Sequence, residues 1–444
     1  MIYLDHAATT PVPKDVADEM YRVLREEYGN PSSQYAYGRQ ARQLVADGRQ
    51  TVADALGCAA KNLYFTACGT ESDNWAFTAA LWQNRRVGKH IVTTAVEHSA
   101  ILERCRWLEQ DGYEVTYLTP DRDGNISADA VLAAVRTDTA LVSVMLVNNE
   151  TGNVYPVAEI AAGLKAKNEK TLLHTDAVQG FLKVPFAAKT LGADFISLSA
   201  HKIGGPKGIG GLYIGERVRN PRPLLPGGGQ ESGFRAGTEA TAQIAGFAKA
   251  VELRTEHLTE KLEHMAQIKA YAMERLAEIP DLRFISKGTA PHVLSVSMPG
   301  YPSQNVVNDL SDAGICISAG SACHQGKPSQ VTAALGLEKK VAAGVVRLSF
   351  GPETTREEID AAAEALKKHH DTRFPMLFRR RKLHIPRCAL RAQLTRSAAA
   401  PFFPPNAALV WRGERRGNED TQAAHSSLCP TTKAYLKSLE ICLR

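Results

Sequence analysis

Short apolar runs alternate with amphipathic stretches between residues 60 and 215. The apolar runs predict strands at 63–66, 90–95, 114–118, 140–147, 171–175, 195–199 and 211–214. The stretches between them, such as 71–86 and 100–110, carry apolar residues at the three-to-four spacing that is typical of helices. Repeated strand–helix alternation predicts a mostly parallel sheet covered by helices on both faces.

The pattern changes beyond residue 215. Residues 238–279 are rich in Ala, Glu, Leu and Lys and predict one long helix, which ends before Pro280 because proline disfavours helix in the residue that precedes it. Residues 283–372 predict a second, smaller α/β unit. Its predicted strands are 292–297, 315–318 and 345–349, and its predicted helices are 304–313 and 356–368.

Charge separates the end of the chain from the rest. The 444 residues carry a formal net charge of +6, but residues 373–444 hold 14 Lys/Arg and 4 Asp/Glu, which leaves residues 1–372 at −4. The segment 373–444 has no sustained periodicity before its last residues, so we predict a disordered basic tail. This tail is either a genuine extension or a frameshift product. A nucleic-acid-binding function would depend on it, and we predict no nucleic-acid partner.

Composition also narrows the compartment. No run of about 18 apolar residues predicts a membrane span, and the first residues do not have the pattern of a secretory signal. Eight cysteines in 444 residues are too few for a disulfide scaffold. We therefore expect a cytoplasmic protein whose cysteines are reduced thiols.

Three segments carry candidate chemistry. Thr70 opens a helix after a strand, where free backbone N–H groups bind phosphate or, alternatively, a capping box forms. Asp176 ends a strand, where it could pair with a protonated pyridine nitrogen or simply cap a helix. Lys202 lies in a glycine-rich turn, as a Schiff-base lysine or as a solvated surface group. In this order the three segments are what a pyridoxal phosphate (PLP) enzyme needs.

Further segments make the pattern more specific. They are 3–10, 97–100, 147–152, 227–231, 235–239, 321–323 and 346–349. With these segments the chain resembles the cysteine desulfurases of the NifS/IscS type, within the class V aminotransferase-like PLP enzymes. The resemblance implies an aspartate aminotransferase-like (fold type I) α/β fold. It implies a large PLP-binding domain at 14–255, a small domain formed by 1–13 and 256–372, and the tail at 373–444.

The resemblance implies the residues that hold PLP. Lys202 should bind PLP covalently, Asp176 should pair with the pyridine nitrogen, and Gln179 should hydrogen-bond the ring hydroxyl. His98 should stack on the ring and move protons, and the alternative is a surface histidine at a helix start. The phosphate should be bound by Thr70, Ser199 and His201, with Thr238 reaching the phosphate of the partner subunit in a homodimer.

The resemblance also implies the substrate side of the site. Asn149 should lie near the ring and the substrate, and Arg347 should pair with the carboxylate of L-cysteine, because a guanidinium binds a carboxylate through two hydrogen bonds. Cys323 lies in a small, polar, glycine-containing segment and should be the thiolate that takes the sulfur. The spacing of Cys316 and Cys323 gives no zinc motif, and no metal site is predicted. Cys68 stands where relatives often carry glycine.

The implied function is conversion of L-cysteine to L-alanine, with the sulfur passing through a persulfide on Cys323 to an acceptor protein. The acceptor would be an iron–sulfur scaffold or a tRNA-thiolation enzyme. Two alternatives stay open. One is a selenocysteine lyase or a related PLP-dependent C–S lyase, and the other is a non-catalytic sulfur-relay scaffold.

Overall fold

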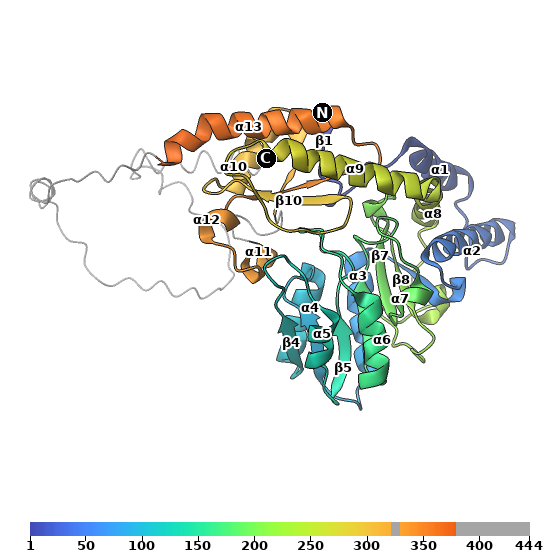
Figure 1. The fold of residues 1–444 in the computed structure, drawn as a ribbon. Coiled ribbons are helices and arrows are strands. Elements are labelled where there is room, and N and C mark those ends of the chain that lie inside the picture. The colour runs from blue at the N-terminus through green and yellow to red at the C-terminus, as the bar shows by residue number, and fades with distance from the viewer. Residues whose placement is uncertain (321–328, 379–444) are drawn as a thin grey trace, which may run out of the picture. The chain divides into compact units, whose positions relative to one another are not determined.

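The computed structural model describes residues 1–320 and 329–378, which belong to one compact unit (Figure 1). Its main sheet is built from β2 (Leu63–Thr66), β3 (His90–Thr94), β4 (Glu114–Leu118), β5 (Thr139–Ser143), β6 (Leu172–Asp176), β7 (Phe195–Ser199) and β8 (Gly210–Ile214). The strand order is β2-β8-β7-β6-β5-β3-β4, and every pair is parallel except those that β8 makes with β2 and β7. The predicted α/β fold class is confirmed.

The central strands of this sheet have no exposed residue, because helices cover both of its faces. Every residue of β3, β5, β6 and β7 is buried, as expected for parallel strands covered on both faces. The covering helices include α3 (Gly69–Gln83), α4 (Ser99–Gln110), α5 (Ala128–Ala134), α6 (Val157–Lys167) and α7 (Ala188–Leu191). Helices α1 (Lys14–Glu26) and α2 (Ala36–Leu56) both pack against α8 (Thr241–Thr255).

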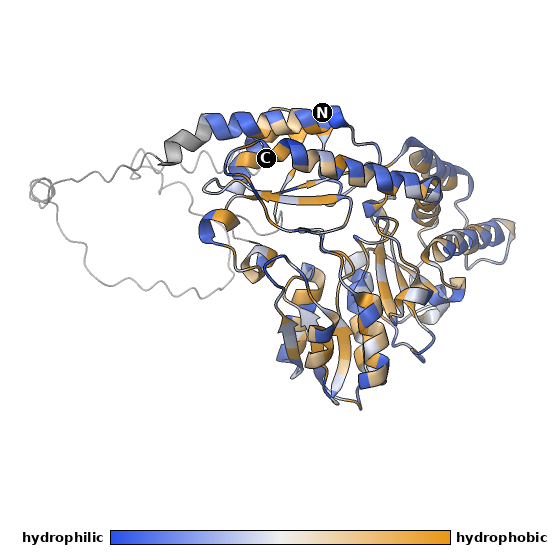
Figure 2. Cartoon of the chain, in the orientation of Figure 1, coloured by the Kyte–Doolittle hydropathy of each residue, from blue (hydrophilic) through white to orange (hydrophobic). Residues whose placement is uncertain are grey.

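The remaining described residues form a smaller antiparallel sheet with the order β12-β13-β10-β9. Its strands are β9 (Arg283–Phe284), β10 (Val293–Ser297), β12 (Ser318–Ala319) and β13 (Val345–Ser349). The helices of this part are α9 (Leu258–Ala277), α10 (Ser303–Asp312), α11 (Gln330–Ala334), α12 (Lys339–Ala342) and α13 (Arg356–Phe378). The first strand of the chain, β1 (Ile2–Tyr3), pairs in parallel with β11 (Ile315–Cys316). In Figure 2 the hydrophobic colour gathers on strands such as β5 and β10, and α13 is largely hydrophilic where it is described.

Three predicted elements differ from those observed. The single helix predicted at 238–279 is wrong, because α8 ends at Thr255 and α9 begins at Leu258. His257, between them, has a left-handed φ of 50°, which a continuous helix cannot include. The strand predicted at 315–318 is interrupted at Ile317, so that β11 and β12 join different sheets. Helix α13 also continues to Phe378, beyond its predicted end at 368.

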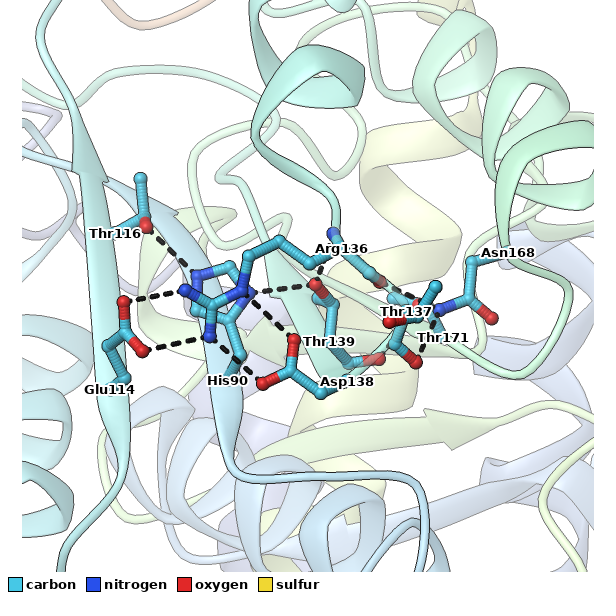
Figure 3. Close-up of polar contacts among 9 residues, drawn as sticks. All are labelled: His90, Glu114, Thr116, Arg136, Thr137, Asp138, Thr139, Asn168 and Thr171. Atoms are coloured by element: carbon cyan, nitrogen blue, oxygen red, sulfur yellow. Dashed lines mark hydrogen bonds and ion pairs between the residues drawn. The ribbon is translucent and has the colours of Figure 1, made fainter.

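A polar network ties the amino ends of β3, β4 and β5 together (Figure 3). Arg136 pairs with Glu114 of β4 at 2.6 Å and with Asp138, which precedes β5, at 2.9 Å. His90, the first residue of β3, bonds Thr139 of β5 at 2.8 Å. This edge is structural, and the carboxyl ends of the same strands lie at the opposite edge. Within the described ranges, no helix combines the length and apolarity needed to cross a membrane.

Candidate active site

The carboxyl edge of the main sheet borders a cavity of about 350 Å³. The predicted site residues that line it are Thr70, His98, Asn149, Asp176, Gln179, Ser199, His201, Lys202 and Arg347. Thr238 is exposed and is not among the lining residues. Cys323 lies outside the described residues, although Gly320 and Gln330, on either side of it in the sequence, both line the cavity.

The start of α3 presents backbone N–H groups to this cavity. The helix begins at Gly69, and its N-cap Cys68 makes no side-chain capping bond. The capping box predicted as the alternative for Thr70 is therefore absent, and Asp73 is instead buried. A Cβ atom at position 69 would lie 2.8 Å from Val178 Cγ2, so glycine is needed for this close approach. Free amides and a positive helix end at a cavity wall suit an anionic group such as phosphate.

Asp176 is a buried carboxylate at the end of β6. Its Oδ1 accepts a hydrogen bond from the Val178 N–H at 2.9 Å, and it makes no ion pair within residues 1–320 and 329–378. Burial raises the pKa of Asp176 to about 6, with repulsion from Asp73 as the next cause. A cation placed beside Asp176 would reverse this cost, because a neighbouring positive charge favours the ionised form.

Two further buried carboxyl groups, which the sequence did not identify as functional, line the cavity. Burial raises the pKa of Asp73 to about 7 and that of Glu97 to about 8. In the described part of the chain, Asp73 Oδ1 and Glu97 Oε2 make no hydrogen bond. One ligand atom each from Asp73, His98 and Asp176 lie within 4.8 Å of one another, so this end of the cavity favours a positively charged group.

Lys202 points its amine at the segment that follows β1. It ends the short 3-10 helix Ala200–Lys202 after β7, and its Nζ donates to the carbonyl oxygens of Ala7 at 2.8 Å and Ala8 at 2.7 Å. The segment 3–10 is part of the family resemblance, but the sequence assigned these carbonyl groups no role. An amine held on two acceptors at a cavity wall is positioned to react with a carbonyl compound.

The two predicted histidines differ in their surroundings. His98 is the N-cap of α4, where its Nδ1 accepts a hydrogen bond from the Ala100 N–H at 3.2 Å, and it also lines the cavity. The helix-start position and the cavity position predicted as alternatives are thus both observed. Burial lowers the pKa of His201 to about 4, with the nearby charge of Lys202 as the next cause. His201 is therefore neutral at pH 7 and can still donate one hydrogen bond.

Arg347 of β13 also lines the cavity. Its Nη1 donates to the Asn149 carbonyl at 2.8 Å, and its Nη2 pairs with Asp5 Oδ1 at 2.8 Å. The buried Nε has no hydrogen-bond partner among the described residues. Nearby, Glu150 Oε2 accepts a hydrogen bond from Ser329 Oγ at 2.5 Å. The sequence did not identify Asp5, Glu150 or Ser329 as functional, because their contacts join segments far apart in the chain.

Comparison with known proteins identifies the family. The aminotransferase class-V model matches residues 2–362, and the chain belongs to this family. Within it, the chain belongs to the cysteine desulfurases: it is 40% identical to the cysteine desulfurase IscS of Methanosarcina thermophila over 369 residues, which cover 82% of this chain and 91% of that relative. The resemblance found in the sequence is confirmed.

Solved structures agree with this assignment. A NifS-like protein superimposes with a TM-score of 0.79 at 35% identity, covering 83% of this chain and 99% of that one. A structure described as SspA in complex with cysteine superimposes with a TM-score of 0.70 at 32% identity, covering 80% of this chain and 100% of the other.

Proposed function

We propose that this protein is a PLP-dependent cysteine desulfurase. The observation that carries the proposal is the convergence on one cavity of a lysine amine, a buried carboxylate without an ion-pair partner, and uncapped helix-start amides. These groups fit the aldehyde, the pyridine nitrogen and the phosphate of PLP, respectively. The raised pKa of Asp176 supports the fit, because a protonated pyridine nitrogen is the cation that would stabilise this buried carboxylate.

Different residues would bind different parts of the cofactor. Lys202 would hold the aldehyde carbon, Asp176 the ring nitrogen, and His98 a ring face. The phosphate would be bound by the amides at the start of α3 together with Thr70, Ser199 and His201. When bound, PLP supplies an electron-withdrawing ring that stabilises negative charge beside the substrate amine.

The substrate-side residues orient L-cysteine. Arg347 has Nη2 on Asp5 and Nη1 on a backbone carbonyl, so the guanidinium is held at the cavity, where it would pair with the substrate carboxylate. Asn149 lies beside it. Lys202 Nζ is the base that takes the α-proton of the substrate.

Cys323 would be the nucleophile that takes the sulfur from the substrate. Its thiolate attacks the sulfur of L-cysteine, so that an S–S bond forms while the C–S bond breaks. The electron pair of the broken bond goes to the β-carbon, which is then protonated, and alanine leaves. The product on the protein is a persulfide, which passes its outer sulfur to an iron–sulfur scaffold or a tRNA-thiolation enzyme.

A homodimer and a cytoplasmic location complete the proposal. Thr238 is exposed, as a residue that reaches a partner's site must be. The segment from α1 to α2 also exposes large side chains that a dimer interface would cover, at Tyr21, Leu24, Tyr28, Tyr35 and Tyr37. The cysteines within the described residues are all free thiols, which agrees with a reducing compartment.

The test is a turnover assay on the full chain reconstituted with PLP. L-cysteine should yield alanine and protein-bound persulfide in equal amounts, and a thiol should release the outer sulfur as sulfide. L-selenocysteine, assayed in parallel, separates the desulfurase from a selenocysteine lyase through the ratio of the two kcat/KM values. Alanine formation from neither substrate would refute the proposed function.

A further inference from the structure

Gln179 lies at the centre of a buried hydrogen-bond network behind the cavity. Its Nε2 donates to the Ala7 carbonyl at 2.8 Å, which also accepts from Lys202 Nζ at 2.8 Å. On its other side, Gln179 Oε1 accepts from Lys183 Nζ at 3.1 Å and lies 3.2 Å from His292 Nε2. Lys183 and His292 come from segments far apart in the chain, and neither lines the cavity.

The network fixes the direction of the Gln179 amide. Lysine is a donor, and a histidine that meets an amide oxygen must donate as well. Two donors on one side therefore require the oxygen of Gln179 there, and they leave only N–H groups for the side that faces Ala7 and the cavity. Without them, only the Ala7 carbonyl would favour this direction, and the amide could more easily rotate by 180° and present an acceptor to the cavity.

The burial of Lys183 and His292 needs an explanation beyond packing. Both side chains are almost entirely buried, and the charges that act on Lys183, those of Lys202, Arg254 and Arg347, are all positive. Burial, followed by these charges, lowers the pKa of Lys183 well below its usual value, and burial together with Lys183, Arg254, Lys269 and Arg347 does the same for His292. Within the described residues these two buried polar groups have no carboxylate partner, and burying them costs free energy of folding. We therefore look for a role in the hydrogen bonds that they make.

His292 also matches the tautomer that this arrangement needs. Its Nδ1 has no hydrogen-bond partner among the described residues, and a neutral ring that donates from Nε2 carries no proton on Nδ1. The single proton of the ring is thus directed at Gln179.

We propose that Lys183 and His292 are positioning residues that hold the Gln179 amide with its N–H groups toward the cavity. The inference rests on the proposed PLP site and adds to it. With the amide fixed, the ring oxygen of bound PLP meets a donor only, which favours the ionised form of that oxygen. If the amide rotated, an acceptor would face the ring oxygen. This would disfavour the ionised form of that oxygen and raise the pKa of the bound cofactor.

The experiment compares the visible absorbance of the PLP-loaded full chain across pH. Lys183→Met keeps much of the buried volume and removes the donor. We expect the midpoint of the absorbance change to move up by about one pH unit, because one unit corresponds to the loss of one modest interaction. His292→Leu, which removes the other donor and disturbs the packing differently, should move the midpoint in the same direction. The dissociation constant of PLP, measured in parallel, reports whether the cavity itself is intact.

Lys269→Met is the matched control. Lys269 is also largely buried and donates to the backbone carbonyls of Gly288 and Ala290, but it does not contact Gln179. This variant should keep the wild-type midpoint. A double-mutant cycle gives the sharper test: in a Gln179→Ala background, Lys183→Met should no longer change the midpoint, because its effect passes through Gln179.

The outcomes separate the two proposals. A wild-type protein that takes up no PLP overturns the proposed function and this inference with it. If wild type binds PLP and both Lys183→Met and His292→Leu keep its midpoint, only the positioning role is wrong. The same holds if Lys183→Met moves the midpoint equally with and without Gln179, since Lys183 would then act directly on the site.

Discussion

Gln179 and Lys202 donate to the same acceptor, the backbone carbonyl of Ala7, at 2.8 Å each. A single peptide group of the segment that follows β1 therefore sets the positions of two of the predicted cofactor-binding side chains. A change in this segment would move both together, even though they are 23 positions apart in the sequence. The candidate site thus depends on the backbone of residues 7 and 8 as well as on its side chains.

Lys202→Ala should abolish covalent attachment of PLP. The variant should bind PLP more weakly, lose the colour of the holoprotein, and yield no PLP-labelled peptide after borohydride reduction and digestion. Lys207→Ala is the matched control, because Lys207 is an exposed lysine of the same glycine-rich turn. Labelling that persists in Lys202→Ala, or that disappears in Lys207→Ala, would assign the covalent role to another lysine.

Cys323→Ala should retain PLP and still bind L-cysteine, since the thiol acts after the substrate is bound. Alanine and persulfide formation should fall by at least about 100-fold, as expected when a nucleophile is removed. Cys68→Ala is the informative control. Cys68 is exposed and lines the cavity, so it is the alternative thiol for this chemistry. Loss of persulfide in Cys68→Ala, with persulfide retained in Cys323→Ala, would reverse the assignment.

Asp73 and Asp176 should contribute a loss of apoprotein stability as pH rises from about 4 to 7. Burial raises the pKa of Asp176 to about 6 and that of Asp73 to about 7, both well above the usual range of an aspartate. At these two groups the folded state therefore binds more protons than the unfolded chain in this window, and their contribution to stability falls as they are forced to ionise. Thermal unfolding of the apoprotein across pH measures the slope.

Asp73→Asn should make that slope shallower, because it removes one of these groups and its repulsion on Asp176. Bound PLP should also make it shallower by supplying a cation to Asp176. Asp138→Asn is the control, since Asp138 is exposed and pairs with Arg136, whose hydrogen bonds hold the pKa of Asp138 below its usual value. An unchanged slope in Asp73→Asn would contradict both the raised pKa of Asp73 and its repulsion on Asp176.

Arg347→Lys should weaken substrate binding more than it affects the cofactor. A lysine replaces the planar guanidinium, whose nitrogens reach both Asp5 and the Asn149 carbonyl, with one compact ammonium group that cannot reproduce this geometry toward the substrate carboxylate. We expect kcat/KM for L-cysteine to fall roughly ten- to a hundredfold, which corresponds to one hydrogen bond to a charged group. PLP uptake should stay the same. Arg136→Lys, in the network of Figure 3, should leave both quantities unchanged.

Removal of residues 379–444 should leave PLP uptake and cysteine turnover intact. The family match ends at residue 362, and the described residues that line the cavity all precede α13. The truncated and full chains should also be compared for binding to DNA over a range of salt concentrations. Salt-dependent binding that vanishes on truncation would revive a nucleic-acid role for the tail.

The sequence predicted the parts of the site that depend on local order. Asp176 and Ser199 end strands and Thr70 follows the start of a helix, so chain position alone places them near the carboxyl edge of the sheet. The carbonyl groups of Ala7 and Ala8 could not be found in this way, because any residue supplies the same acceptor. Asp73 lies in helix α3, and nothing in the sequence pattern of that helix indicates that its side chain faces a second carboxylate.

The break between α8 and α9 was missed for a related reason. Neither glycine nor proline marks it, and Glu256 and His257 are both tolerated in helices. Packing of α9 against α13, rather than local preference, fits the change of direction at His257. Local sequence therefore predicted the helical content of this region correctly and its connectivity wrongly.

The pairing of β1 with β11 sets when this site can form. Ile2 and Tyr3 can pair only after Ile315 and Cys316 have been synthesised, and Asp5 can pair only after Arg347 has been synthesised. During synthesis on a ribosome, Ala7 and Ala8 therefore cannot be held in place until nearly all of the enzyme part of the chain has emerged. A growing chain would expose Lys202 without its acceptors for most of that time, and cofactor capture becomes one of the last events in its maturation.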